Sequence, residues 1–460
     1  MQNLKTDNSE WNRAKIKDVA SVVSGYGFPL SLQGKTSGDY PFIKVRDISE
    51  TVQQGKTHIT SANHYIDTTE LNSIKAKPFS AGTVVFAKIG EAIKLNRRAI
   101  LSQATVADNN VMGIEPNKDK LTSDYLLYFL NTIELEDISH STTVPSIRKG
   151  DVENIDIIFP DIETQQLITK SLKNLLNKTA ASANGIKKSK ILIHQFKQAI
   201  LSAAVTGKLT EEWRDKNNEE IQNNIIEVIS ENINKNNKMS KKSRIHTKTT
   251  YEVHEFEIDV DLPSNWVLEN LGNISELVTD GEHATPIRVE SGIYLLSARN
   301  VQNGYLSLDK VDYIPESEYE RIIKRCNPEE GDVLISCSGS VGRVCVVPKG
   351  IRFTMVRSAA LVKMQANRFL SEYLSYYLQS QLAQNQIFKL QKATAQANLF
   401  IGQIKKIVVV LPPIEEQRLI VEKVRHYFEV ANRVEKQIEK AEARVSKLAQ
   451  AILAKTFNQE

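Results

Sequence analysis

The chain has 460 residues, 25% of them charged, and a net charge of +4, which is typical of a globular protein of two to four domains. No apolar run approaches the roughly 20 residues of a membrane span, and the first residues lack the apolar stretch of a signal peptide. We therefore expect a cytoplasmic protein; the small positive charge permits nucleic-acid binding but does not argue for it.

The sequence repeats itself. Residues 155–168 match residues 407–420, an offset of 252 (407 minus 155), and residues 196–201 match residues 448–453 at the same offset. Upstream the match weakens, although Trp11 and Trp266 open the two halves. Each repeat therefore combines a variable block with a matched block, which indicates an internal duplication.

The two variable blocks, residues 1–160 and 263–412, have the pattern of mixed α/β domains. Short β-branched runs bounded by Gly and Pro, such as residues 84–86 and 333–335, predict strands. Apolar spacing predicts one helix at residues 123–131 and another at residues 371–386.

The matched blocks, residues 161–208 and 413–460, predict two long helices. In each block a β-branched run ends near a proline and an acidic turn follows, which favours a helix start. Apolar residues then recur every seven residues over five heptads, a pattern typical of coiled coils. In the first block the two predicted seams are Ile168, Leu175, Ser182, Ser189, Phe196 and Ala203, and Leu172, Thr179, Ile186, Ile193 and Ile200. In the second block they are Ile420, Tyr427, Val434, Ala441 and Leu448, and Val424, Ala431, Ile438, Val445 and Ile452.

Equal seams in a duplicated chain are expected to pack against each other. If a twofold axis relates the halves, the pairing is antiparallel. Each helix would be about 60–70 Å long at 1.5 Å per residue. The alternative is a pair of ordinary core helices. The predicted fold class is thus α+β: two mixed α/β domains separated and joined by two long helices packed as an antiparallel coiled coil, with a pseudo-twofold internal duplication.

Residues 209–262 predict a polar linker between the repeats. The segment is rich in Asn and Lys, a composition that cannot bury a core. Isoleucines at helical spacing between residues 221 and 233 predict a short interrupting helix. The basic run at residues 241–248 is either part of a solvated linker or a phosphate contact.

The sequence lacks the motifs of enzymes that act on DNA. It has neither the phosphate-binding G-x-x-x-x-G-K-[ST] pattern nor an Asp or Glu followed two residues later by Lys. An acidic or amide residue followed by two prolines and an aromatic residue, typical of amino-methyltransferases, is also absent. Cys326, Cys337 and Cys345 fit no zinc spacing, so we expect reduced core or hairpin thiols, no metal site and no catalytic residues.

This organisation resembles the specificity subunit of type I restriction-modification systems, and the resemblance covers nearly the whole chain. Residues 198–214 (QAILSAAVTGKLTEEWR) look like the central conserved segment of that family, and residues 451–457 (AILAKTF) look like its C-terminal copy. Residues 262–266 (LPSNW) resemble the opening of a target recognition domain. Two departures stand out: Trp11 lacks a preceding Leu-Pro, and the C-terminal copy lacks an equivalent of Gly207.

The resemblance implies a role in DNA recognition without catalysis. Each variable block would be a target recognition domain for one half of a split site in double-stranded DNA, and the helix pair would fix the distance between the halves. The resemblance implies that two methyltransferase subunits would dock on the helices with S-adenosylmethionine. Motor-nuclease subunits would bring ATP, Mg and cleavage; no membrane is involved.

Side chains that donate paired hydrogen bonds recognise bases, whereas basic and hydroxyl side chains contact phosphates. In the first block the candidate DNA-binding residues are Ser24, Tyr26, Lys44, Arg46, Lys88, Lys94, Asn96, Arg97, Arg98, Thr143, Ser146 and Arg148. In the second they are Thr279, His283, Thr285, Arg299, Asn300, Ser338, Ser340, Arg343, Arg357, Lys389, Lys392, Gln396 and Asn398. Alternatives remain: the neighbouring glycines form plain turns, the Arg97–Arg98 pair is solvated, and Asp280 and Glu282 repel phosphate.

Three other functions remain open. The chain could be the recognition subunit of another restriction class or an orphan used only for methylation. It could be a coiled-coil scaffold whose domains bind proteins, or an enzyme whose site has no linear motif. DNA affinity with a methyltransferase partner and turnover by the single chain distinguish these possibilities.

Overall fold

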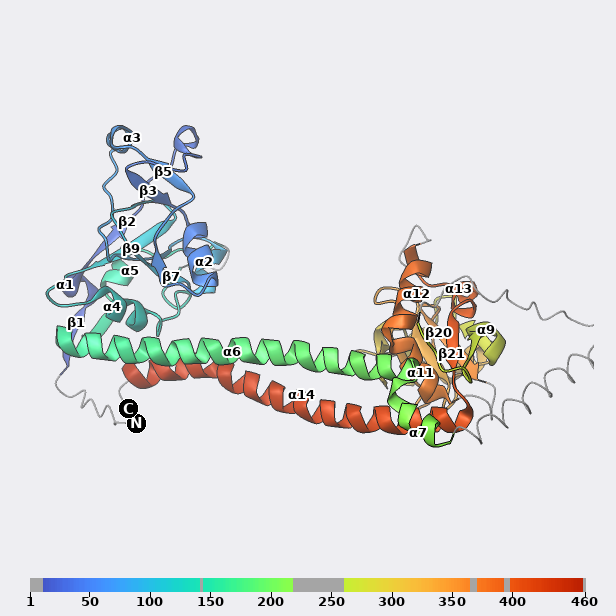
Figure 1. The fold of residues 1–460 in the computed structure, drawn as a ribbon. Helices are drawn as coiled ribbons and strands as arrows, with labels where there is room; N and C mark the ends of the chain where they lie inside the picture. The colour runs from blue at the N-terminus through green and yellow to red at the C-terminus, as the bar shows by residue number, and fades with distance from the viewer. Residues whose placement is uncertain (1–10, 141–143, 218–259, 365–369, 393–397, 458–460) are drawn as a thin grey trace, which may run out of the picture. The chain divides into compact units, whose positions relative to one another are not determined.

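The structure is a computed structural model that describes residues 11–140, 144–217, 260–364, 370–392 and 398–457. It comprises two compact units (Figure 1). The first contains residues 1–187 and 439–460, and the second contains residues 188–438. Most of the predicted linker, residues 218–259, lies outside the described residues.

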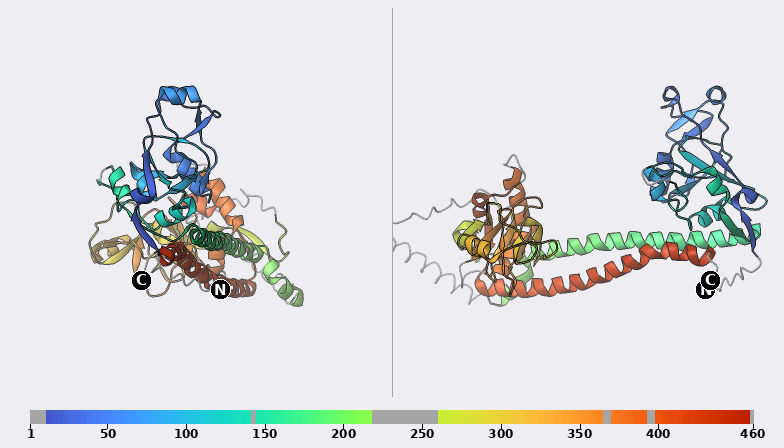
Figure 2. Two further views of the ribbon diagram at one scale, coloured as in Figure 1. Left: turned by 90° about the vertical axis from the view of Figure 1, so that its left-hand side faces the viewer. Right: turned by 180° about the vertical axis from the view of Figure 1, so that it is seen from behind.

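The first unit is a mixed α/β domain. Its sheets have the strand orders β2-β9-β6-β7-β4 and β5-β3-β8, and β1 pairs with β10. Helix α4 lies between the larger sheet and the first turns of α6 (Figures 1 and 2). The elements are β1 (Asn12–Lys15), α1 (Ile16–Val19), β2 (Ala20–Ser24), η2 (Leu30–Leu32), β3 (Tyr40–Ile43), α2 (Val45–Gln53), β4 (His58–Ile59), β5 (His64–Ile66), α3 (Thr68–Ser73), β6 (Val84–Ala87), η3 (Glu91–Leu95), β7 (Arg98–Leu101), β8 (Val106–Ala107), β9 (Val111–Pro116), α4 (Ser123–Leu130), α5 (Lys149–Glu153), β10 (Asp156–Phe159) and the start of α6 (Ile162–Val205).

The second unit has the same plan. Its sheets have the orders β12-β20-β17-β18, β16-β13-β19 and β14-β15, and β11 pairs with β21. The elements are η4 (Lys208–Thr210), α7 (Glu211–Lys216), β11 (Val267–Asn270), α9 (Leu271–Ile274), β12 (Ser275–Asp280), β13 (Ile293–Leu296), η5 (Ala298–Asn300), β14 (Val301–Gln302), β15 (Tyr305–Leu306), β16 (Asp312–Ile314), α10 (Glu316–Ile322), β17 (Val333–Ser336), β18 (Val344–Val346), β19 (Phe353–Met355), β20 (Ala359–Met364), α11 (Ser371–Gln379), α12 (Gln381–Lys392), α13 (Ile401–Lys405), β21 (Val408–Leu411) and α14 (Ile414–Phe457).

The predicted strands at residues 84–86 and 333–335 are confirmed as β6 and β17, whose residues are all buried. The predicted helix at residues 123–131 is confirmed as α4. The helix predicted at residues 371–386 is instead two helices, α11 and α12. The break lies at Ser380, whose backbone is extended and whose hydroxyl donates to the Tyr377 carbonyl. Serine competes with the backbone in this way and so favours helix ends.

The duplication extends to individual hydrogen bonds. Gln165 donates to the Pro160 carbonyl and accepts from the Thr122 amide, and Gln417 does the same with Pro412 and Leu370. All four glutamine bonds are 2.8–3.0 Å long. A buried amide that satisfies both its donor and its acceptor fixes how the long helix leaves the domain. The two halves thus share a framework that extends from the matched glutamines to Thr122 and Leu370 in the weakly matched blocks.

The long helices α6 and α14 each contain 44 residues, and both units include part of each. In the first unit Leu172, near the start of α6, shares a core with Phe457 at the end of α14. In the second unit Phe196 contacts Tyr427 edge to face, and Lys197 donates to Glu435. Thus the start of one helix lies with the end of the other, and the predicted antiparallel pairing is confirmed.

One predicted seam on each helix has no exposed member, whereas the other has three exposed members. The seams through Leu172 and Val424 face the partner helix or the domain. On the other seams, Leu175 and Val434 are 44% and 43% exposed, and the neighbouring positions, such as Leu176, are more buried instead. Leu175 and Leu176 are both apolar, so heptad spacing alone does not choose between them. The exposed seam leaves apolar side chains on the helix surface.

A buried carboxylate joins three segments of the second unit. Glu416, at the start of α14, accepts from Thr210 at 2.7 Å and Arg214 at 2.5 Å through one oxygen, and from the Trp266 indole at 2.8 Å through the other. Arg214 also donates to the Gly207 carbonyl. Gly207 has a φ of +80°, and a Cβ there would lie 2.5 Å from Pro263. This network explains the glycine and the tryptophan singled out in the sequence.

Candidate nucleic-acid interface

Several loops of the first unit meet at one end of its larger sheet. The amide of Gly25, just after β2, donates to the Val111 carbonyl, and that of Tyr26 donates to Ala107. The amide of Asp108 donates in turn to Ile43, just before Lys44. These bonds of 2.8–3.0 Å hold the ends of β2, β3 and β8 together.

Two further loops join this group. The Lys88 amide, after β6, donates to the Asn110 carbonyl, and the Lys88 carbonyl accepts from Ile147 at 2.8 Å. Gly90 donates to Pro145 at 2.8 Å. We call residues 24–28, 43–46, 88–90, 107–110 and 144–148 the first loop cluster. Backbone bonding between loops makes such a surface rigid enough to present side chains in a fixed arrangement.

The second unit repeats the arrangement. Gly281 and Glu282 donate to Ala359 and Met355, at 3.3 and 2.8 Å, as Gly25 and Tyr26 do to Val111 and Ala107. Leu399 donates to the Cys337 carbonyl at 2.9 Å, as Ile147 does to Lys88. We call residues 279–285, 297–300, 336–343, 355–359 and 398–400 the second loop cluster.

Close backbone packing explains a glycine in each cluster. A Cβ at Gly25 would lie 1.9 Å from the Asp108 carbonyl oxygen, and one at Gly281 would lie 2.1 Å from that of Met355. Any side chain would push these strands apart. The two glycines are therefore framework residues rather than plain turn residues.

Ten of the candidate lysines and arginines fall into two groups. Within the described part of the chain, one group has no carboxylate partner: Lys88, Arg97, Arg148, Arg343, Arg357 and Lys389. An unpaired cation keeps its full attraction for phosphate, and each phosphate contact releases counterions from DNA. Of the six, Lys88, Arg148, Arg343 and Arg357 lie in the loop clusters.

The second group has partners within the protein. Lys44 donates to Gln33 and lies 5.3 Å from the Phe28 ring centre. The other three pair with carboxylates: Arg46 with Glu50, Lys94 with Glu91, and Arg299 with Asp312. These pairs are exposed and therefore weak, so DNA phosphates can compete for the cations.

Three candidates belong to the framework instead. Arg98 is 4% exposed and donates to the Ile133 carbonyl, and burial lowers the pKa of its guanidinium to about 10. Asn96 accepts from the Leu135 amide and so holds the same loop. Asn300 is fully buried, where it accepts from Ser297 and donates to Ser307. We leave these three out of the proposed interface.

The remaining candidates are mostly small polar residues. Those that are exposed or half-buried are Ser24, Tyr26, Ser146, Thr279, His283, Thr285, Ser338, Ser340 and Asn398. Thr143, Gln396 and the side chain of Lys392 lie outside the described residues. The loop around Ser338 is closed by buried Ser336, whose hydroxyl donates to the Ser340 carbonyl and accepts from the Arg343 amide.

Arginines that the sequence did not single out neutralise the acidic loop of the second cluster. Arg325 donates to Asp280 at 2.6 Å, and Arg321 donates to Glu282 at 3.0 Å. Hydrogen bonds to Ala284 and the nearby Arg321 charge hold the pKa of Glu282 below its usual range. The arginines are about 40 residues away along the chain, so no local pattern could have identified them.

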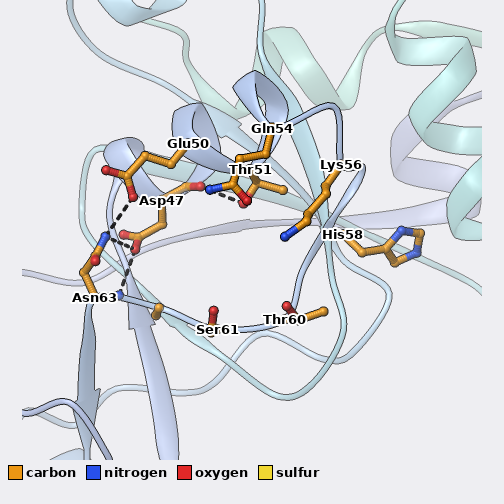
Figure 3. Close-up of a pocket in the computed structure, with 10 residues that line it drawn as sticks. Asp47, Glu50, Thr51, Gln54, Lys56, His58, Thr60, Ser61 and Asn63 are labelled. Carbon is orange, nitrogen blue, oxygen red and sulfur yellow. Dashed lines mark hydrogen bonds between the residues drawn. The ribbon is translucent and has the colours of Figure 1, made fainter. Parts of the chain in front are cut away.

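A small polar pocket lies beside α2 in the first unit (Figure 3). Buried Asp47 accepts from the backbone and side-chain nitrogens of Asn63, both at 2.9 Å, and Glu50 accepts from the same side chain. Lys56 and His58 line the opposite part of the pocket (Figure 3). These hydrogen bonds tie the loop between β4 and β5 to α2. Both carboxylates therefore already have partners within the protein.

The three cysteines are buried thiols, consistent with the predicted core positions. Burial raises the pKa of each to about 12. Among the residues that the structure describes, no group of His, Cys, Asp or Glu could hold a metal ion. None of the described helices has the length and hydropathy to cross a membrane.

A family model described as "Type I restriction modification DNA specificity domain" matches the chain twice, over residues 8–189 and 263–442. The chain is 23% identical to the type I restriction enzyme EcoBI specificity subunit of Escherichia coli, over 99% of this chain and 87% of that protein. It is 20% identical to the MjaVIII specificity subunit of Methanocaldococcus jannaschii, over 95% and 92%. The crystal structure of the HsdS subunit from Thermoanaerobacter tengcongensis has the same fold, with a TM-score of 0.55 and 17% identity over 98% and 97% of the two chains.

Proposed function

The chain belongs to the type I restriction-modification DNA specificity family, and from this premise we propose that it recognises a split DNA site, with one loop cluster for each half. Members of this family are recognition subunits without catalysis of their own. We propose residues 1–160 and 263–412 as the two target recognition domains. Residues 161–208 and 413–460 would form the helices that join them, and residues 209–262 the linker.

The observation that carries this proposal is the doubled loop cluster. The same backbone hydrogen bonds hold both clusters, but exposed side chains at matching positions differ: Arg148 precedes α5, whereas Phe400 precedes α13. A shared framework with different exposed side chains suits two readers of different sequences. The resulting DNA site would be asymmetric.

Cations supply the affinity that does not depend on sequence. Lys88 and Arg148 in the first cluster, and Arg343 and Arg357 in the second, have no carboxylate partner among the described residues. If Lys88, Arg343 and Arg357 each contact a phosphate, these three contacts reduce the logarithm of the binding constant by about 2.7 per tenfold rise in salt. Base contacts then select the sequence.

The long helices would set the distance between the half-sites. A helix of 44 residues is about 66 Å long at 1.5 Å per residue, enough to bridge half-sites about 34–36 Å apart. Joining two weak readers also raises their effective concentration at the DNA.

Catalysis would come from partners, in the cytoplasm where the DNA lies. Methyltransferase subunits, expected to number two, would bring S-adenosylmethionine, and motor-nuclease subunits would bring ATP and Mg. Leu175, Phe196, Val434 and Leu448 are 37–45% exposed on the long helices. Such apolar side chains mark contact surfaces for other proteins, and we propose that the methyltransferase subunits dock there.

The test is methylome sequencing of a host that lacks DNA methylation of its own. The host expresses the chain together with the methyltransferase subunit encoded by the neighbouring gene. We expect one split motif with a fixed gap. If an assembled complex with an active methyltransferase leaves the genome unmethylated, the recognition role is wrong. A protein-binding scaffold then becomes the better explanation.

A further inference from the structure

One exposed residue occupies the same place in both loop clusters. Arg148 precedes α5 and Phe400 precedes α13, and the two positions differ by the repeat offset of 252 (400 minus 148). Each follows a buried residue, Ile147 or Leu399, whose amide donates to the loop after β6 or β17. The matching backbone hydrogen bonds, 2.8 and 2.9 Å long, hold the backbone directly before Arg148 and Phe400 in the same place in each unit.

The buried side chains around this position are alike, whereas the exposed one changes completely. Val152 in α5 and Ile404 in α13 are both fully buried and apolar. Arg148 is exposed, and the Phe400 ring is 55% exposed. Packing therefore does not explain why one unit has a guanidinium and the other a phenyl ring. At this position the exposed side chain differs between the units, whereas the buried residues Val152 and Ile404 are both apolar.

The phenyl ring decides what the position can contact. A phosphate has no apolar group for a neutral aromatic ring to contact. The thymine 5-methyl group, in contrast, is the apolar feature of the major-groove base edges. If Phe400 meets DNA, it therefore meets a base edge. The equivalent Arg148 would then lie at a base edge too, where a guanidinium fits O6 and N7 of guanine.

We propose that the residue before α5 and α13 determines specificity in each domain. Arg148 selects a guanine in one half-site, and Phe400 selects a thymine, through its methyl group, in the other. This inference rests on the proposed function.

Thymine-to-uracil substitution tests Phe400, because uracil lacks only the methyl group. The assembled complex with its methyltransferase is titrated with duplexes that carry the methylome-defined motif. Each thymine of the half-site assigned to the second unit is replaced in turn. We expect one replacement to weaken binding about fourfold, the value of one buried methyl group. Phe400→Ala should abolish that penalty.

Phe388→Ala is the matched control, because Phe388 is also 55% exposed in the second unit. It should retain the uracil penalty. If Phe400→Ala also retains the penalty, or weakens all sequences equally, the assignment of Phe400 is wrong.

Arg148→Lys tests the other half because it keeps the charge but removes the forked donor. We expect discrimination against other bases at one guanine to fall by 10-fold or more, with an unchanged salt dependence. Arg148→Phe should shift that position towards thymine in the methylome. An unchanged motif in both variants would overturn the inference for Arg148.

The behaviour of the unaltered complex distinguishes failure of the proposed function from failure of the specificity assignment. If the unaltered complex shows no sequence preference, the proposed function itself is wrong. If it recognises a split motif that neither position alters, only the specificity assignment is wrong.

Discussion

At the scale of single residues, the burial of charge has the largest consequences. Glu416 is fully buried, and its two oxygens accept three hydrogen bonds. The sequence predicted only an acidic turn that favours a helix start. That Arg214 and Trp266 both meet this carboxylate depends on the folding of distant segments, so the pattern alone could not indicate it.

We expect Glu416→Ala to lower the free energy of unfolding of the second unit by about 3–5 kcal/mol, because Arg214 would keep a largely buried charge without its carboxylate. Urea unfolding followed by Trp fluorescence measures the change. Glu415→Ala is the control, since the Glu415 side chain is 67% exposed. Equal stabilities for the two variants would show that the network contributes nothing.

The three thiols predict a response to alkali. Their pKa values are raised from 9.0 to about 12, so the unfolded chain releases these protons first. Their contribution to stability is complete below pH 9 and is lost as pH rises from 9 to 12, by up to about 1.4 kcal/mol per thiol per pH unit.

At pH 8 a thiol reagent should therefore label only a trace of the native protein. It should label all three cysteines of the urea-unfolded protein. Rapid labelling of the native protein would contradict the buried positions.

At the scale of secondary-structure elements, the sequence predicted both long helices and their pairing but not which apolar neighbour faces inward. Leu175 lies beside Leu176, and Tyr427 beside Phe428, so at these positions heptad spacing alone does not identify the inward-facing residue. Packing against the domains selects the buried face. The same limit applies at Ser380, where one expected helix is two.

Substitutions at two valines of α14 distinguish a residue needed for stability from one needed for docking. Val424 is fully buried, and Val434 is 43% exposed. We expect Val424→Asp to destabilise the second unit by more than about 3 kcal/mol, because an unpaired carboxylate would be buried. Val434→Asp should change stability by less than about 0.5 kcal/mol but weaken capture of the methyltransferase subunit.

Urea unfolding and co-purification measure these two effects. Unfolding by Val434→Asp, or undiminished capture of the methyltransferase, would contradict the proposed docking surface.

At the scale of the whole molecule, the duplication was visible in the sequence because the helix segments match closely. The equivalence of the two variable blocks was visible only at anchors such as Trp11 and Trp266, because most of their matched features are backbone hydrogen bonds. Gly25 and Gly281 illustrate the point: the sequence left plain turns open as an alternative for them, and only the structure shows the carbonyl oxygens against them. Most loops of the candidate interface contain residues proposed from the sequence, whereas the 107–110 loop and the burial of Arg98 and Asn300 were not predicted.

Helix length should set the gap of the DNA site. Seven residues added to the middle of both α6 and α14 keep the heptads in phase and lengthen each helix by about 10.5 Å, or roughly three base pairs at 3.4 Å each. We expect a gap longer by about three base pairs with unchanged half-sites. Methylome sequencing detects the change; an unaltered gap would show that the helices do not set it.

The most direct test of two separate readers is to replace residues 10–155 with the corresponding block of another family member and sequence the methylome of the host. We predict that one half of the motif changes while the other half and the gap stay the same. A motif that changes in both halves, or in neither, would contradict the assignment of one reader to each domain.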